Sequence, residues 1–549
     1  MNEEPGSFTD RRALESKGPR ATVSRPLLTF PLAAPAASAL ATGSGALFWL
    51  AFPTMDNSAL AAITWVPLVL ALHRQSAFRS TLLGWLAGSM SAFLGFFWVP
   101  ETLRTFSGFP AALCFVFAAL LAFYQGGRGA LFGWLVGRAT ARGWPLLPVF
   151  CGAFVASELV YPLLFPWYFA ATVHRWPVLL QVAELGGPIA VGLCLVVVNV
   201  GLAETALAWL EQRPVRWAAP LVGVATVLAT LLYGSLRIAA VEQQITHGES
   251  VTVGVVQANM GLVEKRSDFL EGERRHLDAS TALLEQKVDF LVWSESSLMR
   301  PVRQSSYARE LSSLTQRIGA PAIFGGVVVR EVPDERGYVL HNSAFSSDAS
   351  GTITGRYDKQ YLLAFGEYLP FGEMFPALYR WSPKSGRFTP GTSFDPVMLH
   401  IRGKQHPVTV LICYEDVVPE MTNRAVAQAN PELLVDITND AWFGDSAEPW
   451  QHLALAKLRA IEHRRFLVRG ANSGVSAVVD PVGRVIAQSG TFTRETLIAP
   501  IRFMRANTLY EQLGRWPWLL VSIIVAAAAF FHNGRSSATK TERMARQKG

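Results

Sequence analysis

A series of long apolar runs constrains this chain more than any other feature of its sequence. A run of about 20 apolar residues is long enough for a helix to cross a lipid bilayer. Seven such runs fill most of the N-terminal part of the chain, and an eighth lies close to the C-terminus. We therefore expect about eight membrane-spanning helices, at roughly residues 30–52, 57–73, 81–100, 109–137, 145–165, 187–210, 216–237 and 515–532.

Two of these runs are weaker than the others. The run at 57–73 is short, and the run at 109–137 is interrupted by a polar stretch that includes Gln125 and Arg128. An arginine at membrane depth is costly unless it faces a cavity or reaches the aqueous boundary. Seven or nine spans are therefore the alternatives to eight.

The composition agrees with a membrane protein. Half of the 549 residues are hydrophobic and 17% are charged, which is too apolar for a fully soluble protein. A formal net charge of +7 is also found in nucleic-acid-binding proteins. Two clusters of basic residues, however, lie in the N-terminal and C-terminal tails beside apolar runs, where such clusters act as orientation signals. We therefore expect a lipid bilayer as a partner and no nucleic acid.

The distribution of Lys and Arg predicts the orientation, because these residues are enriched on the cytoplasmic side. With the N-terminus in the cytoplasm, that side holds both basic tails and the arginines of the loops at 74–80, 138–143 and 211–216. The opposite loops, at 53–56, 101–108 and 166–186, hold only Arg104 and Arg175. We expect the aromatic-rich segment 166–186 to lie along the outer surface or to form an ordinary loop with interfacial anchors.

These expectations give a domain organisation with one large external domain. In a bacterium with two membranes, that domain lies in the periplasm and the bundle in the inner membrane. The expected order is a basic cytoplasmic tail (1–27), a bundle of about seven spans (28–240), the external domain (241–512), a last span (513–534) and a second basic tail (535–549).

The external domain alternates strand-like and helix-like segments, which predicts an α/β layered fold. The strand-like segments are rich in β-branched residues and lie at 251–260, 288–297, 321–329, 342–348, 408–416, 433–440 and 473–486. The helix-like segments lie around 268–287 and at 451–469.

Three chemically useful residues follow or end strand-like segments or lie in the loops between them. The run FLVWSES places Glu295 just after a buried strand, Lys359 lies in a Gly- and Pro-punctuated loop, and Cys413 lies in LICYED. The other three cysteines all lie in apolar runs, and no spacing suggests a disulfide framework. A cysteine nucleophile needs a base and a cation for its tetrahedral intermediate, and a Glu, a Lys and a Cys supply all three. Each residue alone is weak evidence, whereas the ordered set is specific.

The surrounding motifs resemble the nitrilase superfamily and, within it, the apolipoprotein N-acyltransferase family. The motifs are VWSES, YDKQYLLAFGEYLPFGE, FTPG, LICYED, NDAWFGDSAEPWQH, RAIEHRR and ANSGVS, and the resemblance covers nearly the whole chain. It implies a multi-span α-helical bundle joined to an external nitrilase-like domain, an α-β-β-α sandwich. It also implies that Glu295 is the general base, Lys359 stabilises the oxyanion and Cys413 carries the acyl group as a thioester.

The resemblance also implies supporting residues and shows departures. Glu367, Tyr414 and Glu415 match family positions near the catalytic set, and the two carboxylates would orient Lys359 and shape the pocket. Ser294 stands where the family has a proline, and Arg266 stands where it has a tryptophan on a flexible arm near lipid. The departure at Arg266 concerns how the enzyme would contact its lipid substrate and leaves the catalytic chemistry unchanged.

The reaction implied by this resemblance is a two-step acyl transfer. A phospholipid donates the acyl group, and the N-terminal amine of a diacylated apolipoprotein accepts it. A monomeric enzyme without a cofactor would suffice. The main alternative is a membrane-tethered amidase that releases its acyl group to water, and a non-enzymatic transporter or scaffold is a second.

Metal binding has little support in the sequence. The histidines are scattered and no HExxH pattern is present. His452 and His463 lie on one predicted helix at a spacing that brings them to one face, but a structural role is favoured for both. We therefore expect no metal site.

Overall fold

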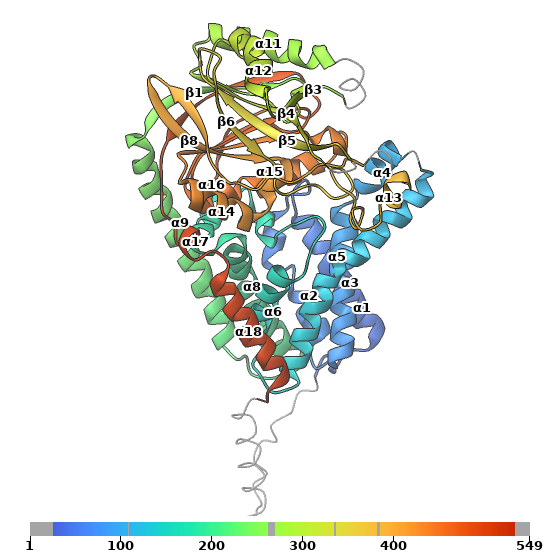
Figure 1. Cartoon of the computed structure of the whole chain (residues 1–549). Helices are drawn as coiled ribbons and strands as arrows, with labels where there is room; N and C mark the ends of the chain where they lie inside the picture. The colour runs from blue at the N-terminus through green and yellow to red at the C-terminus, as the bar shows by residue number, and fades with distance from the viewer. Residues whose placement is uncertain (1–25, 108, 262–268, 334–335, 382–384, 533–549) are drawn as a thin grey trace, which may run out of the picture.

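The computed structural model describes residues 26–107, 109–261, 269–333, 336–381 and 385–532. A helical bundle forms one half of the molecule and a layered α/β region the other, as Figure 1 shows. Nearly all of the two basic tails, and also Arg266, lie outside the described residues.

The bundle contains the helices of the N-terminal part together with the last described helix. Its α-helices are α1 (Ala34–Ala51), α2 (Val66–Leu72), α3 (Ala77–Gly95), α4 (Val99–Ser107), α5 (Ala111–Thr140), α6 (Leu146–Val160), α7 (Pro177–Leu180), α8 (Ala183–Leu210), α9 (Ala218–His247) and α18 (Trp516–Phe530). Two 3-10 helices accompany them, η1 (Ser58–Ala62) and η2 (Phe169–Val173).

Three of these helices, α5, α8 and α9, are long and apolar enough to cross a membrane. Helices α3 and α4, which meet at a bend of 54°, form a fourth candidate when taken as one span. The η1–α2 pair, α6 and α18 are apolar but shorter. Every expected run contains a helix, and the count of eight spans stays a prediction.

The prediction of a loop at 101–108 was wrong, because α4 covers most of this segment. An ion pair of 2.8 Å between Arg104 and Glu101, one turn apart, lies on this helix. Helix α4 also packs against α5. The segment therefore gains both a local and a tertiary contact that a loop would lack.

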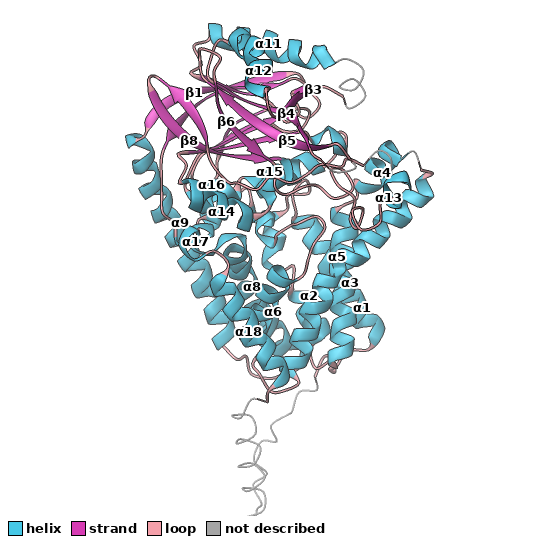
Figure 2. Ribbon diagram, in the orientation of Figure 1, coloured by secondary structure: helices cyan, strands magenta, loops and turns pink. Residues whose placement is uncertain are grey.

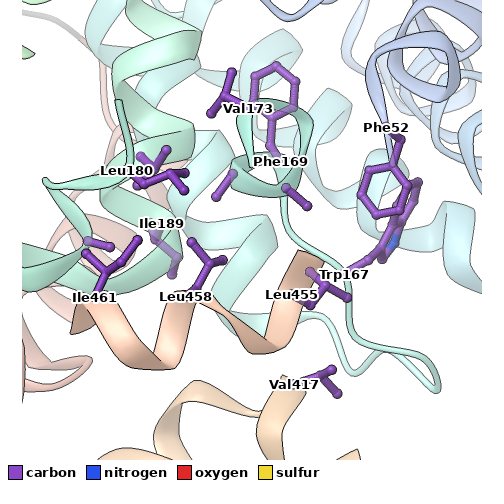
Figure 3. Close-up of a cluster of buried hydrophobic side chains, with 14 of the residues drawn as sticks. Phe52, Trp167, Phe169, Val173, Leu180, Ile189, Val417, Leu455, Leu458 and Ile461 are labelled. Atoms are coloured by element: carbon purple, nitrogen blue, oxygen red, sulfur yellow. The ribbon is translucent and has the colours of Figure 1, made fainter. Parts of the chain in front are cut away.

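Much of the segment 166–186 is buried between the two halves of the molecule, and its position relative to the membrane surface stays a prediction. Trp167, Phe169, Val173 and Leu180 are buried, with 0–3% of each residue exposed. Figure 3 shows them in one cluster with Leu455, Leu458 and Ile461 of the α/β region. Burial between the two halves of the molecule removes the apolar surface of these side chains from water.

The α/β region contains two sheets, shown in magenta in Figure 2. The first has the order β13-β1-β2-β4-β5-β6, with β3 paired to β4; its strands are β1 (Glu249–Gln257), β2 (Phe290–Val292), β3 (Leu298–Arg303), β4 (Ala322–Glu331), β5 (Tyr338–Ser347), β6 (Ile353–Asp358) and β13 (Glu495–Phe503). The second has the order β12-β11-β10-β9-β8-β7, with β7 (Val397–Ile401), β8 (Lys404–Ile412), β9 (Leu433–Thr438), β10 (Leu467–Ala471), β11 (Ala477–Val479) and β12 (Val485–Gln488).

Helices cover both outer faces of the paired sheets. Helices α11 (Phe269–Glu285) and α12 (Tyr307–Ile318) share one buried apolar cluster with the first sheet. Helices α14 (Pro419–Ala429), α15 (Glu448–Ala456) and α16 (Leu458–His463) share another with the second sheet. The two sheets contact each other through β1, β2 and β5 against β7, β8 and β10. The result is the expected α-β-β-α sandwich, with α14–α16 toward the bundle (Figure 1).

Short elements in its loops are η3 (Cys413–Val417), η4 (Asp440–Phe443), α13 (Ala377–Trp381) and α17 (Leu509–Leu513).

The predicted helix at 451–469 is too long. Helix α16 ends at His463, because Arg464 has a left-handed φ of 50°. Residues 467–471 instead form β10, a fully buried strand between β9 and β11. Tertiary pairing decides the structure of this short apolar stretch, which its local pattern leaves open between helix and strand.

A buried ion pair joins the bundle to the sandwich. Glu184 of α8 accepts hydrogen bonds from Arg464 at 2.8 Å and from Arg237 of α9 at 2.5 and 2.8 Å. Arg464 also donates to Gln181 at 2.6 Å. Because an unpaired buried charge is strongly destabilising, these contacts bind the two halves to each other.

Lys457, between α15 and α16, gives a pH-dependent test of this packing. Its ammonium donates to the carbonyl of His174 at 2.8 Å, and burial lowers its pKa to about 8. Between pH 8 and about 10.5, the unfolded chain therefore binds more protons than the folded protein does. The free energy of unfolding rises with pH in that range, and this gain is lost as the pH falls toward 8. Relative to Lys457→Met, we expect wild-type unfolding free energy to gain about 3 kcal/mol across this range.

Thermal midpoints in detergent at a series of pH values measure this difference. Lys404→Met, at a lysine that is 65% exposed, is the matched control. A wild-type minus Lys457→Met difference that stays constant from pH 7 to 10.5 would contradict the buried position of the ammonium.

Candidate active site

Three segments that follow strands bring Glu295, Lys359 and Cys413 together. Lys359 follows β6 directly, Cys413 follows β8 directly, and Glu295 comes three residues after β2. The Lys359 ammonium lies 3.5 Å from Glu295 Oε1. The exposed fractions are 5% for Glu295, 1% for Lys359 and 2% for Cys413. Residues far apart in the sequence thus form one buried cluster just beyond the carboxyl ends of β2, β6 and β8.

Both charged groups act on the Cys413 thiol. Burial raises its pKa well above the ordinary value, the Glu295 carboxylate raises it further, and the Lys359 ammonium lowers it. The thiol is therefore protonated at neutral pH and needs a base before it can act as a nucleophile. The Asp440 carboxylate also raises the pKa of this thiol. Glu295 and Asp440 are carboxylates, and Asp440 is already paired with Arg469 and His452, so Glu295 is the candidate base.

The Lys359 ammonium stays charged in spite of its burial. Burial by itself lowers its pKa, but Glu367, Glu295 and Cys413 outweigh burial and raise the pKa well above its ordinary value. Glu367 Oε2 lies 2.8 Å from Lys359 Nζ and also accepts a hydrogen bond of 2.8 Å from the Leu363 amide. A fixed cation beside a thiol can stabilise negative charge on an attacked carbonyl oxygen.

Asn342 of β5 connects the two carboxylates, and the sequence analysis did not single it out. Its Nδ2 donates to Glu295 Oε1 at 2.6 Å and to Glu367 Oε1 at 2.7 Å. Its backbone carbonyl accepts from the Lys359 amide at 2.8 Å. The local signal in the sequence was an asparagine at the start of the strand-like segment 342–348.

Cys413 lies at a turn with a left-handed φ of 55°, which is unfavourable for a residue with a side chain. Glu415 stabilises this turn, because its carboxylate accepts from the Ile412 amide at 2.8 Å. The same carboxylate accepts from the amides of Gln360 and Tyr361 at 2.6 and 3.0 Å. Glu415 therefore joins the nucleophile turn to the loop after Lys359, whereas Glu367 contacts Lys359 directly.

Tyr414 connects the site to the bundle. Its ring contacts Phe165 of the bundle, with ring centroids 5.9 Å apart, and its hydroxyl donates to Glu448 at 3.1 Å. Phe443, which packs against Tyr414, also contacts Trp98 of the bundle at 5.3 Å. Aromatic side chains of the bundle therefore reach the residue next to the nucleophile.

Polar residues of α5 hold the segment that carries Phe165. Gln125 donates to the Phe165 carbonyl at 2.9 Å and accepts from the Leu164 amide at 2.9 Å. Arg128 donates to the Trp167 carbonyl at 2.9 Å. These bonds explain why a polar stretch interrupts an apolar run: it satisfies a non-helical backbone segment inside the bundle.

The charge of Arg128 is also paired. Its Nη1 lies 3.3 Å from Glu158 Oε1 of α6, and its guanidinium lies 5.2 Å from the centre of the Trp167 ring. An intramembrane arginine is tolerated when it faces the interior and has such partners.

Among the described residues, Asp440, Glu448 and His452 form a buried group whose ligand atoms lie within 4.8 Å of one another. The Arg469 guanidinium lies within this group, 3.1 Å from Asp440 Oδ2 and 2.8 Å from His452 Nδ1. Burial alone would raise the pKa of Asp440, but Arg469 and His452 lower it to about 2. The guanidinium thus already provides the positive charge that a metal ion would bring.

The two histidines of the predicted helix lie apart and have different partners. His452 contacts Asp416 at 2.8 Å from α15, and His463 contacts Glu511 at 3.2 Å from α16. The break between α15 and α16 separates them, so the expectation that they share one helix face was wrong.

Family profiles match both halves of the chain. The profile "Carbon-nitrogen hydrolase" matches residues 252–509, and the profile "Apolipoprotein N-acyltransferase N-terminal domain" matches residues 44–201. The first covers the sandwich, and the second covers most of the bundle.

Curated relatives match the chain over most of its length. The apolipoprotein N-acyltransferase of Geobacter metallireducens is 29% identical over 505 residues, which are 89% of this chain and 95% of the relative. The enzyme of the same name from Pseudomonas putida is 29% identical over 515 residues, 88% of this chain and 95% of the relative. Among solved structures, an amidase from Nesterenkonia sp. is 20% identical, with a TM-score of 0.35 over 50% of this chain and 97% of that one.

The bridging role of Asn342 can be tested by Asn342→Asp, which replaces a shared donor by a third carboxylate. The added negative charge opposes the thiolate, so we expect modification of Cys413 by a small thiol reagent at pH 7 to slow by about tenfold or more. Peptide mass spectrometry measures the rate at this cysteine.

Asn423→Asp is the matched control, because Asn423 is a buried asparagine that donates to the Tyr510 carbonyl at 2.8 Å, outside the catalytic cluster. It should lose stability but keep the wild-type rate at Cys413. Equal rates of Cys413 modification in wild type and Asn342→Asp would contradict the bridging role of Asn342 between Glu295 and Glu367.

Proposed function

Because the chain belongs to the apolipoprotein N-acyltransferase family, we propose that it moves a fatty acyl group from a phospholipid to the N-terminal amine of a diacylated apolipoprotein. The acyl group travels as a thioester on Cys413. Glu295 is the general base, and Lys359 stabilises the oxyanion. Glu367, Asn342 and Glu415 are positioning residues.

One observation carries this proposal: a buried thiol lies beside a carboxylate and an ammonium, and the adjoining Tyr414 contacts the helical bundle. A thiol, a base and a cation are the requirements of covalent acyl transfer. Contact with apolar helices suits a substrate whose reacting ester lies at the boundary of a bilayer.

In the first step, Glu295 takes the Cys413 proton and the sulfur attacks the sn-1 ester carbonyl of the phospholipid. The charge that develops on the carbonyl oxygen is stabilised by Lys359. Collapse of the tetrahedral intermediate breaks the ester C–O bond and forms the thioester. Protonated Glu295 gives its proton to the departing alkoxide, so the first product is a lysophospholipid.

In the second step, the free amine of the diacylglyceryl-cysteine attacks the thioester carbonyl. An amide bond forms, the C–S bond breaks, and Glu295 transfers the amine proton to the Cys413 thiolate. The enzyme returns to its starting state without any cofactor.

The acyl-enzyme must be protected from water until the amine arrives. The near-complete burial of Cys413 supports this requirement. The loop after Lys359 carries exposed apolar side chains: Phe365, Phe371 and Met374 are 57%, 73% and 71% exposed. We assign to this loop the role of a roof that contacts acyl chains.

We place the chain in the inner membrane of a bacterium as a monomer, with residues 241–512 in the periplasm and about eight spans. The excess of Lys and Arg on one side of the apolar runs supports this orientation. The apolar helices α5, α8 and α9 support membrane insertion.

Cys413→Ala tests the function directly. Purified enzyme in lipid–detergent micelles is mixed with a diacylated lipopeptide and a phospholipid that carries a labelled sn-1 chain, and the triacylated product is quantified. Without a nucleophile, the rate should fall by roughly 10³-fold or more, since the covalent route is lost.

Cys194→Ala, at a free cysteine of α8, is the matched control and should keep near wild-type activity. Full activity of Cys413→Ala would refute the thioester route. Release of the label as free fatty acid, with no labelled lipopeptide, would favour the hydrolase alternative.

A further inference from the structure

A cavity of about 490 Å³ lies where the sandwich meets α9, away from the candidate active site. It is formed by the last turns of α9, the end of α16 and the segment that leads from β13 to α17, on the left of Figure 1. Its lining consists of Glu184, Arg237, Gln244, His247, Gly248, Arg464, Phe503, Met504, Arg505, Ala506, Asn507 and Thr508. None of the six predicted site residues belongs to it.

The length of α9 places this cavity at the depth of lipid headgroups. Leu221, Leu228, Leu232 and Leu236 are 61–63% exposed, so one face of the helix is available to lipid. Arg237 is the first charged residue of α9, and it lies about 28 Å along the axis from the start of the helix. The hydrocarbon core of a bilayer is about 30 Å thick. Arg237 and the turns after it therefore coincide with the polar boundary.

The lining carries an excess of positive charge. Three arginines face a single carboxylate, Glu184, which already accepts from Arg237 and Arg464. The two bonds from Arg237 use Nε and Nη2 and leave Nη1 out of the pair. Arg505 is 49% exposed and has a loose contact of 3.3 Å with Glu432.

The remaining lining groups suit an anion with an attached apolar part. Gln244, Asn507 and Thr508 are neutral polar residues, and Phe503 and Met504 provide an apolar wall. Guanidinium groups bind phosphate oxygens strongly, often through two parallel hydrogen bonds. The cavity volume also falls in the range of about 300–1,000 Å³ that small-molecule sites occupy.

We propose that this cavity binds a phosphate group, through Arg237 and Arg505, at the outer boundary of the membrane. A phospholipid headgroup and free phosphate share this chemistry, and the depth of the cavity favours the lipid. A lipid held here is separate from the acyl donor, because the cavity lining excludes Cys413. The bound lipid would attach the sandwich to the bilayer at a point next to the ion pairs of Glu184.

Arg505→Glu is the test variant, because Arg505 takes no part in the Glu184 ion pairs and its own contact is exposed. Arg484→Gln is the matched control: Arg484 is 44% exposed and contacts Glu242 of α9 at 2.6 Å, but does not line the cavity. All three proteins are purified in a phosphate-free detergent buffer, and size exclusion with thermal midpoints verifies their folding.

In the lipid arm, each protein is incubated with phosphatidylglycerol, and native mass spectrometry counts the lipids that stay bound. Wild type and Arg484→Gln should retain one lipid with an affinity about tenfold or more above that of Arg505→Glu, as expected for the loss of a charged hydrogen bond. In the phosphate arm, inorganic phosphate alone is titrated while the thermal midpoint is followed.

A difference between wild type and Arg505→Glu in the lipid arm supports a headgroup site. A difference confined to the phosphate arm supports a phosphate site filled from solution. Equal behaviour of wild type and Arg505→Glu in both arms overturns the proposal. Because no arm measures acyl transfer, the result is independent of the proposed function.

Discussion

The buried Lys359 ammonium is the charge on which the arrangement around it depends. It is 1% exposed and lies 2.8 Å from Glu367 and 3.5 Å from Glu295. A charge removed from water costs several kcal/mol unless partners compensate it. Both carboxylates are therefore needed to keep Lys359 inside the fold. The side-chain amide of Asn342 donates to both of them and fixes their positions. The same ammonium lowers the pKa of the Cys413 thiol, so one group serves both the packing and the chemistry.

The bundle contributes to the site as well as to membrane insertion. Gln125 and Arg128, which would be costly in a simple span, hold the irregular segment that carries Phe165. Phe165 in turn packs against Tyr414, directly after the nucleophile. A chain of contacts therefore runs from the interior of the bundle to the reacting centre. The polar groups of the bundle have a physical reason to exist, because they satisfy backbone atoms that a regular helix would satisfy by itself.

The alternation of strand-like and helix-like segments was sufficient to predict an α/β layered domain, whereas the sandwich and the roles of Glu295, Lys359 and Cys413 were implied by the family resemblance of the motifs. Asn342 was missed because its contacts arise from the pairing of β5 with its neighbours and from the loop after Lys359. The segment 451–469 was assigned wholly to a helix for a similar reason: its last part becomes a strand only when β9 and β11 lie on either side. Arg469 has no local partner, and only distant carboxylates make its burial possible.

The most direct test of the account is the mass of the enzyme after incubation with phospholipid alone. The account predicts one fatty-acyl adduct, located on Cys413 by peptide mapping, which persists in water and disappears when a diacylated lipopeptide is added. Glu295→Gln should form this adduct far more slowly, because no base takes the thiol proton. Absence of an adduct on Cys413 in wild type, while the triacylated lipopeptide is still produced, would contradict the account.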